Sequence, residues 1–266
     1  MAHIYSNKNR SLWLTIFGSA VLFFLVVPSI IVIPMSFSGS SYLEFPPTSY
    51  SLRWYETYFS SEVWMSSTGT SLLAAFLTTI IAMPLGTLCA YGLYCSSARV
   101  RNAGQILIIL PITIPVILIG VGIFNIYAKV GLNYTLPGVV LAHLAMALPF
   151  VIITVLSGLH NHDLNQELAA RSLGASRAYA FWTVTVPQVR YSIQTGAFLA
   201  FIISLDEVVI SMLVSGGEYA TVTRRMFNSL RDQLDPTIAA ISTCLITVSV
   251  LALVVVQMMG KRKDNL

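Results

Sequence analysis

The sequence has few charged residues and few cysteines. Only 10% of its 266 residues are Asp, Glu, Lys or Arg, whereas soluble domains carry about 25%. Apolar residues make up 56% and the mean hydropathy is +0.76, which indicates a bundle of membrane helices rather than a soluble core. The three cysteines lie in or beside apolar segments, so we expect reduced packing residues and no disulfide framework.

Signatures of nucleotide and metal chemistry are also missing. No Gly-x-x-x-x-Gly-Lys-Ser/Thr sequence occurs, so we expect no phosphate-binding loop for ATP in these residues. We find no metal-binding cluster and no nucleophile–base pair, and we therefore predict a non-enzymatic chain without a metal or cofactor of its own. An intramembrane enzyme would need serine and histidine at one depth, and His143 is the only histidine within an apolar run.

Apolar runs long enough to cross a membrane recur six times. A spanning helix needs about 20 apolar residues, and membrane helices tolerate the prolines that several of these runs contain. The first run lacks a convincing cleavage site, so we expect it to remain as a span. We predict an all-α, polytopic membrane protein with six transmembrane helices in one domain, residues 1–266. The spans are residues 12–34, 68–94, 105–128, 136–158, 192–215 and 237–259.

Basic residues in the connecting segments predict the orientation. With a cytoplasmic N-terminus, ten lysines and arginines lie inside and five outside. Both termini are then cytoplasmic, and the net charge of +4 reflects topology rather than a nucleic-acid-binding surface. The inner ten are Lys8, Arg10, Arg99, Arg101, Arg171, Arg177, Arg190, Lys261, Arg262 and Lys263; the outer five are Arg53, Lys129, Arg224, Arg225 and Arg231.

The cytoplasmic segment 159–191 has the pattern of two short helices joined by a glycine. Asp163 or Asn165 can begin the first helix, and Gly174 suits the left-handed conformation that ends it. Ser176 can begin a second helix, which we expect to end before Pro187. The segment is either an ordinary amphipathic loop or an element that docks in a cleft of another protein.

The first of these helices has side chains suited to docking. Ala169 and Ala170 are small and allow close approach, while Leu168 and Leu173 form an apolar knob. We expect three charged side chains to surround this knob at its rim. These are Glu167, Arg171 and Arg177.

The stretch from Gln166 to Ala175 resembles the coupling loop of ABC-importer permeases. That family's pattern is Glu-Ala-Ala, three residues, Gly, nine residues, Ile, one residue, Leu-Pro. Gly174 and Pro187 fall in register, whereas Leu168 stands at the Glu position and the acid comes one residue earlier. Val184 and Val186 replace the aliphatic pair. The candidate residues for ATPase coupling are Glu167, Leu168, Ala169, Ala170, Arg171, Leu173, Gly174 and Ala175.

Asp206 and Glu207 lie in the fifth expected span. A charge at the bilayer centre costs about 2.5–3.5 kcal/mol on the insertion scale, so such acids normally face a cavity or a partner. On a continuous helix Glu207 shares a stripe with serines at 204, 211 and 215, which favours Glu207 as the acid facing a solute path. Asp206 becomes the stronger candidate if the helix unwinds there. The alternative is a polar clamp to Asn125, to His143 or to a partner subunit. The candidate pathway residues are Asp206, Glu207, Ser204 and Ser211.

The segment Ser204–Ser211, with Gly216-Gly217 and Asp235-Pro236 after it, resembles permeases of spermidine and putrescine importers. The resemblance implies the type I ABC importer permease fold, half of a translocation pathway, and the bacterial inner membrane as location. It also implies partners: two ATPase subunits that bind ATP and magnesium, a second homologous permease, and a periplasmic substrate-binding protein. Permeases for iron, opines or amino-acid-like solutes belong to the same branch. A stand-alone secondary transporter or channel is the alternative, and it has no need of a coupling loop.

Overall fold

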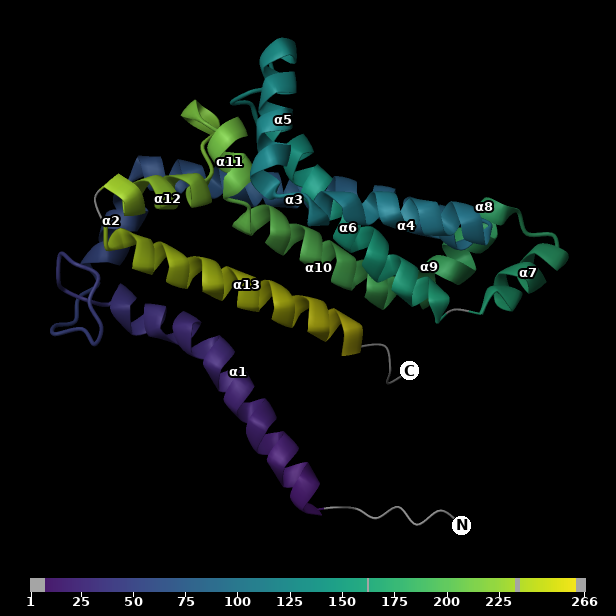
Figure 1. Cartoon of the computed structure of the whole chain (residues 1–266), viewed down its shortest axis with the longest axis horizontal. Helices are drawn as coiled ribbons and strands as arrows, with labels where there is room; N and C mark the ends of the chain where they lie inside the picture. The colour runs from purple at the N-terminus through teal and green to yellow at the C-terminus, as the bar shows by residue number, and fades with distance from the viewer. Residues whose placement is uncertain (1–7, 162, 233–234, 262–266) are drawn as a thin grey trace. The chain divides into compact units, whose positions relative to one another are not determined.

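The computed structural model of the chain describes residues 8–161, 163–232 and 235–261, and most of these residues are helical (Figure 1). These residues contain no β-strand, only an isolated bridge between Ser38 and Tyr50. The helices are, in chain order, α1 (Lys8–Ser36), α2 (Arg53–Ser60), α3 (Glu62–Tyr94), α4 (Ala98–Thr113), α5 (Val116–Val130), α6 (Leu136–His160), α7 (Leu164–Ser172), α8 (Arg177–Ala180), the π-helix η1 (Phe181–Thr185), α9 (Val186–Gln188), α10 (Arg190–Asp206), α11 (Val209–Val214), the 3-10 helix η2 (Gly217–Tyr219), α12 (Val222–Asp232) and α13 (Thr237–Lys261).

The chain divides into two compact units, residues 1–60 with 229–247 and residues 61–228 with 248–266. In the first unit, aromatic side chains fasten the end of α1 to α2. The hydroxyl of Tyr55 lies 2.7 Å from Ser36 Oγ, and its ring centroid lies 5.2 Å from that of Phe37. The indole of Trp54 donates a hydrogen bond to the Ser40 carbonyl at 3.1 Å. These contacts order the polar segment that follows α1.

Four described helices are long and apolar enough to cross a membrane, over residues 12–36, 62–94, 136–160 and 237–258. They match four of the six expected spans. Pro84 and Pro149 lie inside α3 and α6, so the helices tolerate these prolines as expected. Two of the basic residues assigned to the cytoplasm, Arg262 and Lys263, lie outside the described residues.

The expected span 105–128 is not one straight helix. It corresponds to parts of α4 and α5, which meet at an angle of 94°. Ile114 between them is extended, at φ −80° and ψ 135°, because a proline ring disfavours the helical region for the residue before it. Pro115 therefore ends a helix instead of being tolerated inside one, whereas Pro111 remains within α4.

The expected span 192–215 is interrupted at the acidic pair. α10 ends at Asp206, Glu207 is extended at φ −69° and ψ 109°, and the six-residue α11 begins at Val209. The continuous helix assumed from the sequence is therefore wrong at this point. The described residues thus contain four helices that could span a membrane, or five if the bent pair α4–α5 is one span, where six continuous helices were expected.

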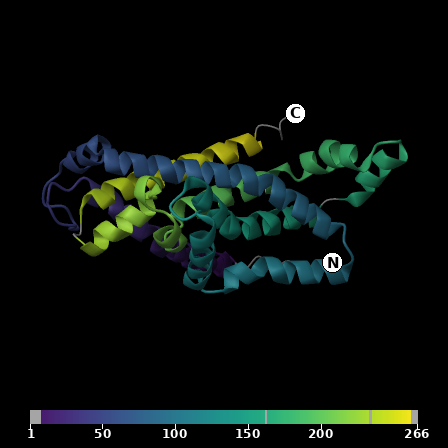
Figure 2. The ribbon, with the colours of Figure 1, turned by 90° about the horizontal axis from the view of Figure 1, so that it is seen from above.

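The second unit is built on α3, α6 and α10, which lie side by side (Figure 1 and Figure 2). Small residues allow this approach, since Ala82 and Ala147 are fully buried and Gly86 of α3 packs on Val151 of α6. Contacts between small residues are typical of helices that associate in lipid, where little hydrophobic drive remains. The residues between α6 and α10 extend from one end of this core, and the acidic pair lies at the other end of α10.

Gly86→Ala is expected to destabilise the unit by about 1–3 kcal/mol, the usual cost of overpacking. A Cβ at position 86 would lie 2.6 Å from Cγ1 and 2.9 Å from Cβ of Val151, so α3 and α6 must separate. Reversible unfolding of the purified protein in mixed micelles measures the change. Gly92→Ala on the same helix is the matched control, because its Cβ would meet nothing within 4 Å. Equal stability of the two variants would contradict this account of the α3–α6 contact.

Candidate functional site

The segment between α6 and α10 forms the helix–glycine–helix element that the sequence predicts. Asp163 caps α7, its side chain accepting the Asn165 N–H at 2.9 Å. Gly174 follows α7 with φ +97°, the left-handed conformation that favours glycine. The Ser176 hydroxyl accepts the Tyr179 N–H at 3.2 Å and begins α8. Local capping rules therefore account for both helix starts and for the turn.

The sequence predicted that the second helix of this element ends before Pro187, and this prediction is wrong. α8 continues through the π-helix η1 into α9, and Pro187 lies in the first turn of α9. The wide turn of η1 is the kind of local adjustment that accommodates a proline within helical structure.

Glu167 is buried inside this element, so the prediction that it lies at the rim of the apolar knob is wrong. Its side chain is 3% exposed. The Tyr91 hydroxyl donates to Oε1 at 2.6 Å, and the Thr185 hydroxyl donates to Oε2 at 2.6 Å. Each carboxylate oxygen thus has a hydroxyl donor, one from α3 and one from η1.

The Tyr91 ring is held on two further sides. The Phe181 ring centroid lies 4.5 Å away, and the Arg177 guanidinium lies 5.4 Å from the Tyr91 centroid. Arg177 Nε also donates to the Tyr91 hydroxyl at 3.4 Å, and this hydrogen bond raises the pKa of Arg177. The arginine therefore stays positively charged beside a ring that carries the contact to Glu167.

The opposite side of α7 is exposed. Leu168 is 52% and Leu173 is 90% exposed, so neither leucine is covered by its own chain. Of the other candidate coupling residues, Ala169, Arg171 and Gly174 are exposed, and Ala170 and Ala175 are half-buried. The element therefore has an inner side that holds Glu167 and an outer side that presents two leucines with small and basic neighbours.

The break after α10 is stabilised by the side chain and the carbonyl of Glu207. Its Oε1 accepts the Ile210 N–H at 2.9 Å, and its carbonyl accepts the Thr223 hydroxyl at 3.1 Å. Backbone groups freed by a helix break need such partners, because lipid offers none. Glu207 is half-buried, and its carboxylate is already engaged at the start of α11.

A buried histidine joins the two sides of the break. His143 Nδ1 lies 2.8 Å from Ser204 Oγ in α10, and Nε2 lies 2.9 Å from Ser211 Oγ in α11. His143, Ser204 and Ser211 are 1%, 2% and 0% exposed. Two serines of the expected polar stripe, Ser204 and Ser211, therefore contact His143 and do not line a surface of this chain. The alternative hypothesis was a clamp between His143 and the acidic pair, but His143 instead holds Ser204 and Ser211.

Asp206 is the acid that remains exposed. No hydrogen bond or ion pair engages its carboxylate within the described part of the chain. On α10 it shares one face with Thr195, Leu199 and Ile202, at spacings of four, three and four residues. The unwound backbone thus separates the two acids, leaving Asp206 on the α10 face and Glu207 at the break.

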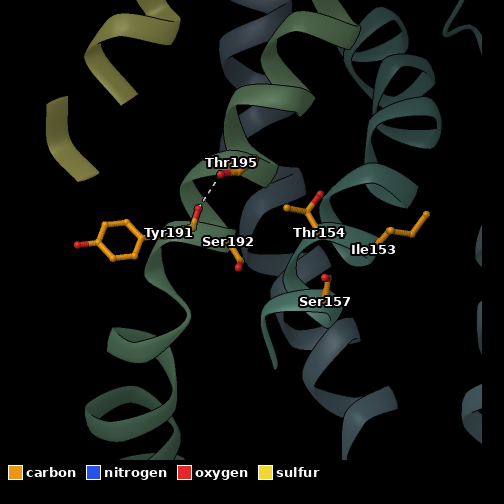
Figure 3. Close-up of a pocket in the computed structure, with 6 residues that line it drawn as sticks. All are labelled: Ile153, Thr154, Ser157, Tyr191, Ser192 and Thr195. Atoms are coloured by element: carbon orange, nitrogen blue, oxygen red, sulfur yellow. Dashed lines mark hydrogen bonds between the residues drawn. The ribbon is translucent and has the colours of Figure 1, made fainter. Parts of the chain in front are cut away.

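A pocket of about 420 Å³ lies between α6 and α10 at the end near α7. Figure 3 shows hydroxyl-bearing side chains of both helices around it, with the Tyr191 ring directed away from α6. The Thr195 hydroxyl donates to the Tyr191 carbonyl at 2.8 Å. Thr195 also belongs to the face of α10 that carries Asp206. The lining residues are Ile153, Thr154, Ser157, Tyr191, Ser192 and Thr195.

Two residues that organise these sites, Tyr91 and Thr185, were not found from the sequence, and His143 was named only as a possible clamp for the acids. Tyr91 and Thr185 contact Glu167 from 76 and 18 positions away, and no periodicity connects such positions. His143 was noted as the one intramembrane histidine, and a buried polar residue in an apolar helix is a general signal of an interhelical contact. No group of three or more His, Cys, Asp or Glu in the described residues could hold a metal ion.

The arrangement is that of a membrane protein with an exposed helix–glycine–helix element and a helix that is broken at its acidic pair. The chain belongs to the family described as the binding-protein-dependent transport system inner membrane component, which matches residues 82–265. It is therefore a multi-pass inner-membrane protein with the all-α fold of ABC importer permeases.

Two curated relatives cover most of the chain. The spermidine/putrescine transport system permease protein PotC of Haemophilus influenzae is 30% identical over 94% of this chain and 96% of its own length. The putrescine transport system permease protein PotI of Escherichia coli is 29% identical over 89% of this chain and 86% of its own length.

A solved structure shares the fold. It is a bacterial alginate ABC transporter in complex with an alginate pentasaccharide-bound periplasmic protein. One of its chains matches with a TM-score of 0.72 at 16% identity, covering 96% of this chain and 95% of that chain. At this identity the likeness supports the fold and leaves the solute to other arguments.

Gly174→Val is expected to abolish ATP-driven uptake while membrane insertion stays normal. A β-branched residue resists positive φ, and the φ of +97° at this position directs the chain from α7 to α8. A Cβ here would meet nothing within 4 Å, so the effect is conformational and not a clash. Gly174→Asn is the control, because asparagine adopts positive φ more readily. Normal uptake by the valine variant would show that this turn is not needed for coupling.

Proposed function

We propose that the chain forms half of the translocation pathway of an ATP-driven importer and is moved by a separate ATPase that docks on α7. The observation that carries this proposal is the two-sided geometry of α7, which presents Leu168 and Leu173 to solvent and holds Glu167 within the chain. Two exposed leucines beside small residues suit an apolar cleft in a partner. ATP and magnesium then belong to the ATPase dimer, in accord with the missing phosphate-binding loop.

The proposed solute is a polyamine such as spermidine or putrescine, or a related small cation. A polycation needs a carboxylate on its path, and the exposed Asp206 supplies one. The relatives named above are polyamine transport permeases, which favours this solute over the opines, amino-acid-like compounds or iron carried by other members of the branch. The hydroxyl-lined pocket on the same face of α10 offers uncharged acceptors closer to the cytoplasm.

In the proposed cycle, a periplasmic binding protein delivers the solute, and closure of the ATPase dimer displaces α7 and opens the path outward. The solute reaches Asp206 and leaves inward when the ATPases separate. A second homologous permease completes the pathway. This requires cytoplasmic termini, because α7 lies between the fourth and fifth expected spans. The periplasmic protein bound in the alginate transporter structure supports the delivery step.

Two other functions are less well supported. A stand-alone secondary transporter or channel does not require an exposed element such as α7. An intramembrane hydrolase could use the histidine–serine contact, but His143 is 1% exposed and both of its ring nitrogens lie against serines. A catalytic histidine instead needs an orienting carboxylate on one nitrogen and a reachable nucleophile on the other.

Asp206→Asn is expected to weaken uptake of labelled spermidine roughly tenfold to a hundredfold, since one contact to a charged group contributes about 1.5–3 kcal/mol. Glu207→Gln should have a smaller effect, because a glutamine oxygen can still accept the Ile210 N–H. The structure thus reverses the order of effects expected for a continuous helix.

Uptake and binding-protein-stimulated ATP hydrolysis are measured for both variants at matched expression. If Glu207→Gln loses transport and Asp206→Asn transports normally, then Glu207 and not Asp206 is the acid that meets the solute. Normal transport in both variants would remove the main physical support for a cationic solute.

A further inference from the structure

α7 has few attachments that could carry force into the membrane. It is nine residues long, it is bounded by the cap at Asp163 and the turn at Gly174, and it packs against α8 and η1. Side-chain hydrogen bonds from two of its residues reach other elements in the described part of the chain. One is the amide pair Gln166–Gln188, which is exposed, and the other involves the buried carboxylate of Glu167. A docked partner therefore acts on the membrane helices largely through the backbone or through Glu167.

Glu167 reaches α3 directly, and α3 passes the helix break. Tyr91 is near the cytoplasmic end of α3, and Thr78 lies 13 residues earlier, or about 20 Å along the helix. Thr78 Oγ1 lies 3.5 Å from Ser204 Oγ, the serine that also contacts His143. Farther along α3, the Ser71 hydroxyl accepts the Val222 N–H at 2.9 Å. The single helix α3 thus contacts Glu167 of α7, Ser204 just before the break, and Val222 at the start of α12.

We propose that Glu167 is a positioning residue that fastens α7 to α3, so that α3 transmits displacement of α7 to the break beside Asp206. The inference rests on the proposed coupling function and adds the route by which coupling occurs. Hydrogen bonds to an ionised carboxylate are short and strong, and the two here, both 2.6 Å, come from different elements. Glu167 therefore acts within the chain, while Leu168 and Leu173 face the partner.

Two conservative variants test this link. Thr185→Val keeps the side-chain shape and removes the donor to Oε2, and Tyr91→Phe keeps the ring on Phe181 and removes the donor to Oε1. The intact transporter, with its ATPases and binding protein, is reconstituted in vesicles. Spermidine uptake and phosphate release are measured in the same sample. Each variant should lower the number of solutes moved per ATP roughly tenfold, the effect of one lost hydrogen bond to a charge.

Thr183→Val is the matched control. Thr183 is two residues from Thr185 and exposed, and its hydroxyl donates to the Tyr179 carbonyl in its own helix. The Thr183→Val variant should move as many solutes per ATP as the parent protein does. Co-purification of the ATPase should be unchanged in all three variants, because none alters the exposed leucines. If Thr185→Val assembles and keeps the parental ratio of solute to ATP, the link is overturned.

A second readout does not depend on the solute. Nitroxide labels are placed at Ser172 on α7 and at Ser97 after α3, in a chain whose three cysteines are replaced by serine. The distance between the labels should stay the same between the nucleotide-free and ATP-bound complexes of the parent, and should change in Thr185→Val. A constant distance in both would overturn the link. A parent complex that takes up no spermidine would count against the proposed solute, and the label distances would still decide the link.

Discussion

Polar groups inside a membrane protein must find their partners within the protein, and the break between α10 and α11 depends on that requirement. The Ile210 N–H is satisfied by the Glu207 carboxylate, and the Glu207 carbonyl by Thr223. His143 then contacts one serine on each side of the gap. A break without these partners would leave several groups unsatisfied, each costly in lipid. The exposed position of Asp206 beside the break therefore depends on residues other than Asp206 itself.

The same requirement explains why the side chain of Glu167, on the inner side of α7, can be buried. Glu167 is removed from water, but both of its oxygens accept hydroxyl hydrogen bonds, and Arg177 lies against the tyrosine that donates one of them. A buried charge that lost one partner would be strongly destabilising. The burial thus makes the position of α7 sensitive to small changes in α3 and η1, as the proposed coupling role requires.

Local rules predicted much of the fold, and long-range contacts account for what they missed. The caps at Asp163 and Ser176 and the turn at Gly174 follow from residue types within a few positions of one another. Pro84 and Pro149 are tolerated whereas Pro115 ends a helix, and composition alone does not distinguish these cases. The burial of Glu167 depends on Tyr91, 76 positions away. The polar stripe was misassigned because its derivation assumed an unbroken helix.

The exposure of Leu173 has a thermodynamic consequence for the free chain. A leucine that is 90% exposed keeps almost all of its apolar surface in water. Full burial of the Leu173 side chain by a partner contributes about 1.5–3 kcal/mol, which raises an association constant roughly tenfold to a hundredfold. Because apolar burial weakens on cooling, the proposed contact of an ATPase with this leucine should lose strength at low temperature.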